Sequence, residues 1–323
     1  MARADLLVSL VRASAEGDRG RVRKATEAII AEERAKNHHV LADRLTRAVA
    51  NGAESPRAAF VVHGSAWRRF ATELVPRRRL EDLVLSDANR AACRDLIEEQ
   101  RRASVLRAHS LEPRHRVLLV GPPGNGKTTL AEAIAEALSV PFIVVRYETM
   151  IGSYLGETAN RLKRVVDYAR TTPCVLFFDE FDAVAKERGD THETGEIKRV
   201  VTSLLMQVDG LPSYTVTVAA TNHPELLDRA VWRRFQLRLS LDPPSERDLA
   251  RYLEKFGRHM GGGLGHAPAK LAARLGPVSY AEAEEFCLDV KRRFALGTGG
   301  VGMKAAVTAT LKLWEERGRV VAE

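Results

Sequence analysis

The most chemically informative segment of this sequence is the glycine-rich run at residues 121–129, which reads Gly-Pro-Pro-Gly-Asn-Gly-Lys-Thr-Thr. It follows an apolar stretch at 115–120 and precedes a helical pattern, which is the context that a phosphate-binding loop of this spacing requires. Glycines let such a loop curl so that its backbone N–H groups face a polyphosphate, and the positive end of the following helix adds to the attraction. The run therefore predicts a nucleotide site rather than an ordinary Gly-Pro turn.

Two side chains of this run are expected to act directly on the bound phosphates and on Mg²⁺. Lys127 would contact the β- and γ-phosphates, and the Thr128 hydroxyl would ligate the metal ion. The other residues of the predicted binding loop are Pro123, Gly124, Asn125, Gly126 and Thr129. The loop thus predicts a nucleotide polyphosphate and Mg²⁺ as ligands.

A pair of adjacent carboxylates, Asp179 and Glu180, follows the apolar run 174–178. Ligands bind at the C-terminal edge of a parallel sheet, so both groups are expected beside the phosphate loop. Asp179 would hold the Mg²⁺ hydration shell, and Glu180 would orient and deprotonate the attacking water. A solvated acidic turn is the alternative, but it does not explain why an apolar strand ends in two acids.

A third polar position follows the apolar run 216–220, where Thr221 and Asn222 stand. An amide can donate a hydrogen bond to the γ-phosphate and accept one from water without adding charge. In isolation, Thr-Asn before His-Pro is more often a turn. Because two matched motifs precede it, Asn222 is expected to act as a catalytic sensor between nucleotide and water.

These polar groups can lie together only if the ends of their strands meet at one edge of a sheet. The hydrophobic pattern after residue 80 predicts such a sheet. Short apolar runs alternate with helical segments near 128–138, 158–171, 196–208 and 225–232. This alternation is typical of an α/β fold, here a P-loop NTPase with a parallel five-stranded sheet sandwiched by helices. The five expected strands are 117–120, 142–145, 174–178, 216–220 and 235–241.

Changes of pattern along the chain predict four segments. A small N-terminal helical recruiting domain (1–52) and a linker (53–79) precede a large ATPase subdomain (80–243) and a small all-α lid (244–323). Residues 1–79 hold 16 Lys and Arg against 9 Asp and Glu, whereas the remainder holds 34 against 33. The basic N-terminal part could contact an acidic partner or a nucleic acid, although a solvated helical face is the commonest reason for such charge.

Composition excludes several classes of protein. With 323 residues, 45% of them hydrophobic and 28% charged, the chain is expected to be neither disordered nor membrane-embedded. No apolar run approaches the roughly 18 residues of a membrane span. Three scattered cysteines, Cys93, Cys174 and Cys287, suit neither a disulfide framework nor a zinc site, so they are expected to be buried thiols in a reducing cytoplasm.

Together these motifs resemble the AAA branch of the AAA+ ATPases, which includes katanin, spastin and membrane-bound zinc peptidases, over about residues 80–295. Residues 226–235, which end in Arg-Arg-Phe, are similar to the arginine-finger segment of that family. The resemblance implies that Arg233 and Arg234 reach the γ-phosphate bound to a neighbouring subunit, where a fixed planar charge stabilises the transferring phosphoryl group. A basic sheet edge is the alternative interpretation.

Residues 150–157 are similar to the first pore loop of the family, in which an aromatic and an aliphatic residue, here Tyr154 and Leu155, project into a central channel. An aromatic side chain offers a large apolar contact at little entropic cost, which suits gripping an extended polypeptide. The alternative is that Tyr154 packs against a helix. The charged stretch 186–198, with His192, stands at the place of the second pore loop.

The lid contains one local signal and one departure from the family pattern. Ser279 and Glu282 are spaced as a capping box at the start of a helix. Tyr280 stands where the family usually has glycine, which leaves open how the lid contacts the ATPase subdomain. The sequence contains no HExxH segment, so no intrinsic protease follows from it.

The resemblance implies ATP and Mg²⁺ as cofactors. It also implies a homo-hexameric ATPase that remodels, unfolds or threads protein substrates through a central pore. Its N-terminal domain could recruit an adaptor or a separate peptidase, and neither a nucleic acid nor a membrane is expected as a partner. Two alternatives are a nucleic-acid loader or helicase-like motor, and a nucleotide-gated assembly scaffold. Balanced charge after residue 80 and an aromatic pore loop count against the motor, and Glu180 and Arg233 favour hydrolysis over a scaffold.

Overall fold

The computed structural model describes residues 26–28, 30–32, 67–145, 155–181, 205–297 and 302–321. Its internal contacts divide the chain into two units, Met1–His63 and Gly64–Glu323. Of the first unit only two short helical pieces, 26–28 and 30–32, are described. Tyr154 and the stretch 186–198 lie outside the described residues, so the expectations for both pore loops stay predictions.

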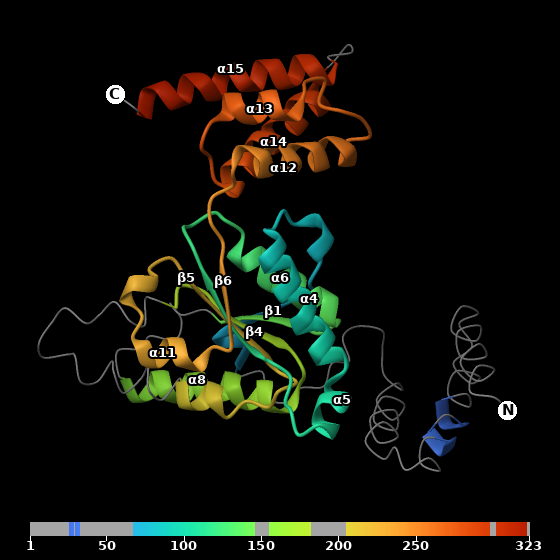
Figure 1. Ribbon diagram of the computed structural model, residues 1–323, viewed down its shortest axis with the longest axis vertical. Coiled ribbons are helices and arrows are strands. Elements are labelled where there is room, and N and C mark those ends of the chain that lie inside the picture. The colour runs from blue at the N-terminus through green and yellow to red at the C-terminus, as the bar shows by residue number, and fades with distance from the viewer. Residues whose placement is uncertain are drawn as a thin grey trace, which may run out of the picture. The chain divides into compact units, whose positions relative to one another are not determined.

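The centre of the second unit is a mixed sheet with the strand order β1-β3-β4-β5-β2-β6 (Figure 1). Its five parallel strands correspond to the five that the sequence predicts, which are β2 (Arg116–Val120), β3 (Phe142–Val145), β4 (Val175–Phe178), β5 (Val216–Thr221) and β6 (Leu237–Ser240). The α/β fold class is therefore confirmed. The ends of β2, β4 and β5 carry the phosphate loop, the carboxylate pair and Asn222.

One further strand lies in the segment that the sequence analysis assigns to a linker. β1 (Ala71–Leu74) pairs antiparallel with β3 at the edge of the sheet, with Ala71 opposite Val145. Just before it, in the 3₁₀ turn η2 (Trp67–Arg69), Trp67 stacks on Tyr168 with ring centroids 4.3 Å apart. Only the first of the four strand residues is buried, so the segment has no alternating pattern that would identify it in the sequence.

Helices cover both faces of the sheet (Figure 1). α4 (Asp87–Arg101), followed by the short α5 (Ala103–Ala108), and α6 (Lys127–Leu138) lie on one side, and α8 (Leu155–Thr171) and α11 (Arg229–Arg234) lie on the other. The central strand β4 is continuously apolar because both of its faces are covered. Val175 and Phe177 pack in the core with α4 and α6, and Leu176 and Phe178 pack in the core with α8 and α11.

The three cysteines are free thiols, and all three are buried, as predicted. Burial raises the pKa of the Cys93 thiol to about 11. The same cause raises the pKa values of Cys174 and Cys287 to about 12. All three thiols are therefore protonated and unreactive at neutral pH.

Four helices after the sheet form a separate core around Leu249, Leu253 and Phe286. They are α12 (Glu246–His259), α13 (Pro268–Leu275), α14 (Tyr280–Leu296) and α15 (Met303–Val321). The predicted capping box at α14 is confirmed, because the Ser279 N–H donates to Glu282 Oε2 at 2.6 Å and the Glu282 N–H donates to Ser279 Oγ at 3.3 Å. None of the helices in the described part of the chain has the length and apolar composition that a membrane span requires.

Candidate active site

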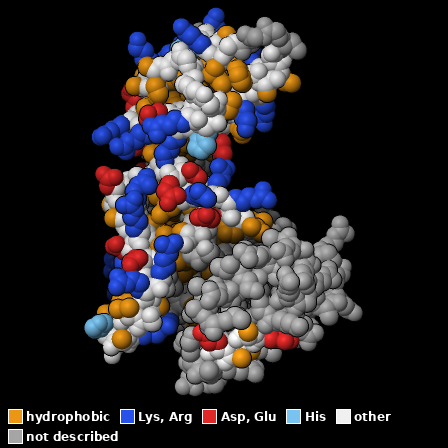
Figure 2. Space-filling view, turned by 90° about the vertical axis from the view of Figure 1, so that its right-hand side faces the viewer, with side chains coloured by type: hydrophobic (Ala, Val, Ile, Leu, Met, Phe, Trp, Pro, Cys, Tyr) orange, Lys and Arg blue, Asp and Glu red, His pale blue; other side chains and the backbone are white. Residues whose placement is uncertain are grey.

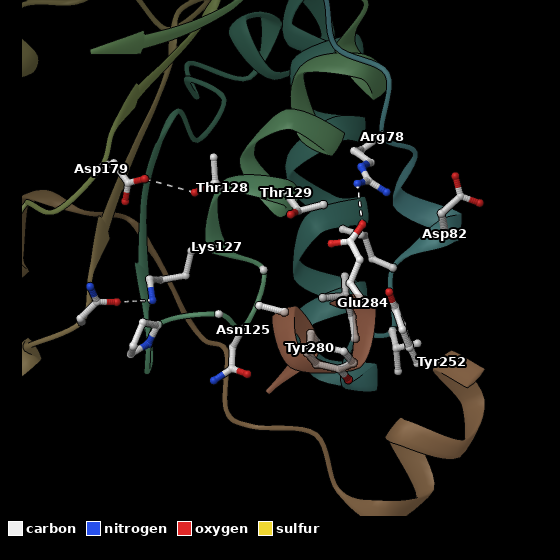
Figure 3. A pocket seen from close by; sticks show the side chains of 18 of the residues that line it. Arg78, Asp82, Asn125, Lys127, Thr128, Thr129, Asp179, Tyr252, Tyr280 and Glu284 are labelled. Atoms are coloured by element: carbon white, nitrogen blue, oxygen red, sulfur yellow. Dashed lines mark hydrogen bonds and ion pairs between the residues drawn. The ribbon is translucent and has the colours of Figure 1, made fainter. Parts of the chain in front are cut away.

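A cavity of about 400 Å³ lies between the phosphate loop and the helical lid (Figure 3). All loop residues from Pro123 to Thr129 line it, and so do Asp179, Glu180 and Asn222. The strand order explains this convergence, because β2 pairs with β5 and β5 pairs with β4, so that their C-terminal ends lie together. The structure thus brings the three predicted motifs to one cavity.

The phosphate loop has a backbone that depends on its glycines. Gly121, Gly124 and Gly126 have positive φ values of 148°, 76° and 83°. A Cβ at Gly121 would lie only 2.2 Å from the carbonyl oxygen of Leu241, so a side chain cannot be accommodated there. α6 begins directly after Gly126, and the first residues of this helix line the cavity, so the positive end of the helix faces it.

Lys127 joins the phosphate loop to the end of β5. Its ammonium is buried and donates to the carbonyl oxygens of Gly121 and Pro122, at 2.6 and 2.9 Å. It also donates to Asn222 Oδ1 at 2.6 Å. A cation held by neutral oxygens beside a cavity can exchange them for phosphate oxygens, which form stronger, charge-assisted hydrogen bonds.

Thr128 and Asp179 offer the oxygen atoms that Mg²⁺ prefers. The Thr128 hydroxyl donates to Asp179 Oδ2 at 3.2 Å, and the backbone N–H of Glu180 donates to Asp179 Oδ1 at 3.0 Å. Mg²⁺ in nucleotide sites is held by one or two protein oxygens together with phosphates and water, so this pair fits the ion. When bound, Mg²⁺ would neutralise charge on the phosphates.

Glu180 has a strained backbone, with a φ of +48° in the left-handed region and an exposed side chain. A non-glycine residue in such a region costs about 1–3 kcal/mol, which is tolerated where neighbours enforce it. Here the next residue, Phe181, is buried and donates its N–H to the Ala220 carbonyl of β5 at 2.8 Å. Its ring also contacts Phe178 and Phe235 edge-on, at 6.3 and 6.0 Å between centroids. Phe181 thereby holds the turn that presents Glu180 at the cavity.

The two predicted finger arginines do not line the cavity of their own chain. They are the last two residues of α11, and Arg234 forms an ion pair with Asp209 at 2.8 Å. Asp209 also binds Arg116, again at 2.8 Å. Arg233 is exposed and forms no ion pair with any residue that the structure describes.

Two contacts of the lid were missed by the sequence analysis, one at the cavity and one outside it. Arg78, the middle of an Arg-Arg-Arg triplet, forms an ion pair with Glu284 of α14 at 3.0 Å (Figure 3). Lys255 of α12 donates to the backbone carbonyls of Glu81 and Leu83, at 2.5 and 3.3 Å. These contacts connect the lid to the segment before α4. The triplet in the sequence was the one available signal.

A parallel sheet with a phosphate loop after β2 and carboxylates after β4 defines a P-loop nucleotide-binding domain. Residues 117–243 match the family described as "ATPase family associated with various cellular activities (AAA)". The chain is 38% identical over 293 residues to an uncharacterized AAA family ATPase, y4kL, of Sinorhizobium fredii, a match that covers 89% of this chain and 88% of the relative. The chain belongs to the AAA family of ATPases, and it hydrolyses ATP with Mg²⁺.

Two other relatives are similar over about half of this chain. The peroxisomal ATPase pex6 of Schizosaccharomyces pombe is 36% identical over 165 residues, or 49% of this chain and 17% of pex6. The ATP-dependent zinc metalloprotease FtsH 1 of Symbiobacterium thermophilum is 36% identical over 186 residues, or 55% of this chain and 31% of the relative. This chain therefore spans less than a third of either protein.

Proposed function

We propose that this AAA ATPase assembles into a homo-hexameric ring that remodels, unfolds or threads protein substrates through a central pore. The observation that carries the ring is the position of Arg233, which is exposed on α11 and outside its own nucleotide cavity. An arginine at that place can complete an active site only in another subunit. A protein substrate is supported by the similarity to FtsH 1, whose name describes a protease.

In the proposed mechanism of ATP hydrolysis, the residues of the cavity and the finger arginines have separate roles. Lys127 binds the β- and γ-phosphates, and Thr128 and Asp179 hold Mg²⁺. Glu180 takes the proton of the attacking water, and Asn222 keeps that water and the γ-phosphate in position. Arg233 of the adjacent subunit stabilises the charge on the transferring phosphoryl group, and Arg234 lies beside it, held by Asp209.

The proposed division of the chain follows the same scheme. Residues 1–52 recruit an adaptor, a separate peptidase or the substrate, and 80–243 and 244–323 form the ATPase subdomain and its lid. The segment expected as a linker, 53–79, contributes β1 to the sheet of the ATPase subdomain. We place the protein in the cytoplasm, for which the buried free thiols are the support. Residues 80–323 hold 34 Lys and Arg against 33 Asp and Glu, and on the coloured part of the face in Figure 2 the two kinds of charge are mixed, which favours a protein over a nucleic acid as substrate. DNA binding that weakens steeply with salt would support the nucleic-acid motor instead.

Tyr154→Ala tests the threading function. The variant should hydrolyse ATP within a few-fold of the normal rate but should fail to remodel a protein substrate. The reason is that each lost contact between the aromatic ring and the substrate costs about 1–3 kcal/mol of binding free energy, and several subunits of the ring would lose this contact together. The measurement compares ATP turnover with the unfolding of a fluorescent folded protein that carries an unstructured tail.

Tyr154→Phe is the matched control and should unfold the same substrate normally, because it keeps the ring. Normal unfolding by Tyr154→Ala would contradict the proposal. A joint loss of ATP binding and thermal stability in this variant would instead indicate that Tyr154 packs against the fold.

A further inference from the structure

The nucleotide cavity has a second end that the phosphate chemistry does not use. Figure 3 shows Asp179 and Lys127 at one end and Tyr252, Glu284 and Arg78 at the other, with Tyr280 between them. On the side of the sheet this second end is lined by the aliphatic residues 83–85. One end thus carries the phosphate loop and Lys127, and the other carries aliphatic and aromatic side chains beside the Arg78–Glu284 ion pair, so the cavity as a whole suits a nucleoside polyphosphate.

Tyr280 is held in a defined place at this second end. It is the first residue of α14, and its neighbour Ala281 donates its N–H to the carbonyl oxygen of Gly124 at 2.9 Å. A Cβ at Gly124 would lie 3.0 Å from Ser279 Oγ, so the start of α14 contacts the phosphate loop closely. The position of the Tyr280 ring is therefore tied to the position of the phosphates.

The ring of Tyr280 is supported from the side by a second aromatic residue. Tyr252 of α12 lies edge to face with it, with centroids 5.8 Å apart and an angle of 62° between the rings. Tyr280 is half-buried, and burial raises the pKa of its hydroxyl to about 12, so the side chain is neutral at neutral pH. A neutral ring beside a polyphosphate adds no repulsion, and the supporting contact fixes its orientation.

We propose that Tyr280 contacts the adenine base of bound ATP and forms the lid side of the base site, opposite residues 83–85. Aromatic side chains bind nucleobases through their faces, and the aliphatic residues would contact the other face of the base. The family that this chain resembles usually has glycine at this position, and glycine has no side chain that could contact the base. The inference rests on the proposed phosphate site at Lys127.

Three ligands that the enzyme does not hydrolyse separate the contributions of phosphate, sugar and base: pyrophosphate, ribose 5-diphosphate and ADP, each with Mg²⁺. Equilibrium titrations compare the wild type with Tyr280→Ala, Tyr280→Phe and Phe294→Ala. Tyr280→Ala should weaken ADP binding by about five- to fiftyfold and leave pyrophosphate and ribose 5-diphosphate within about twofold. Tyr280→Phe should bind ADP normally because it keeps the ring.

Phe294→Ala removes an exposed ring from the same helix, away from the cavity, and should change none of the three affinities. Unchanged ADP binding by Tyr280→Ala would overturn the proposal. An equal loss of pyrophosphate affinity would also overturn the proposal, because the ring would then act by packing on the phosphate loop. A loss of ribose 5-diphosphate affinity equal to the loss of ADP affinity would overturn it too, because the ring would then contact the sugar and not the base.

Failure of the proposed phosphate site gives a different result: the wild type would not bind pyrophosphate, and Lys127→Ala would bind ADP normally. If Tyr280→Ala does not fold, as judged by its thermal unfolding, Tyr280→Leu provides the same comparison with an apolar side chain that has no ring.

Discussion

Glu180→Gln is expected to bind ATP and assemble normally while its turnover falls by about 10²- to 10⁴-fold, the usual contribution of a general base. The amide has the shape of the carboxylate but cannot take a proton from water. Both side chains tolerate the left-handed backbone at this position equally poorly, so the strain at φ +48° does not change with the substitution. The measurement combines an equilibrium ATP titration with steady-state phosphate release.

Two controls make this result specific. Lys127→Ala should weaken ATP binding itself, because it removes the ammonium that we propose binds the β- and γ-phosphates. Glu225→Gln alters an exposed carboxylate that pairs with His223 outside the cavity, and it should keep normal turnover. Wild-type turnover by Glu180→Gln would show that another group deprotonates the water.

Arg233→Ala is expected to lower ATP turnover by about 10³- to 10⁵-fold, the range measured for arginine fingers. A mixture of Arg233→Ala and Glu180→Gln subunits should nevertheless recover part of the activity. In such a mixture the intact cavity of an Arg233→Ala subunit can receive the arginine of a neighbouring Glu180→Gln subunit. The measurement is phosphate release as a function of the mixing ratio at constant total protein.

Arg229→Ala is the matched control, because Arg229 is an exposed arginine at the start of the same helix α11. It should retain turnover in unmixed assemblies. A mixture as inactive as its two components would mean that Arg233 acts within its own chain, and the proposed ring would lose its main support.

Much of the site could be predicted because each of its motifs is local in the sequence. The phosphate loop needs glycines and a lysine at fixed spacing, since only glycine adopts these backbone angles cheaply. The parallel strands are short apolar runs because both of their faces are covered by helices. The capping box of α14 involves only Ser279 and Glu282. Family membership, fold class and ATP hydrolysis all follow from such short segments.

Features that depend on contacts between residues far apart in the sequence were decided by the tertiary structure. β1 is a strand only because β3 offers it an unpaired edge. The left-handed turn at Glu180 exists because Phe181 is anchored to β5 and to the ring of Phe235. Arg78 meets Glu284 across 206 residues of chain.

The physical reason is common to these cases. Hydrophobic periodicity and turn residues report the interactions of a segment with its immediate neighbours and with an unspecified core. They do not report which residue of a distant segment a side chain will contact in the folded protein. The sequence by itself thus determined the phosphate end of the cavity, whereas the aromatic end, with Tyr252 and Tyr280, arose only when helices α12 and α14 packed beside the phosphate loop.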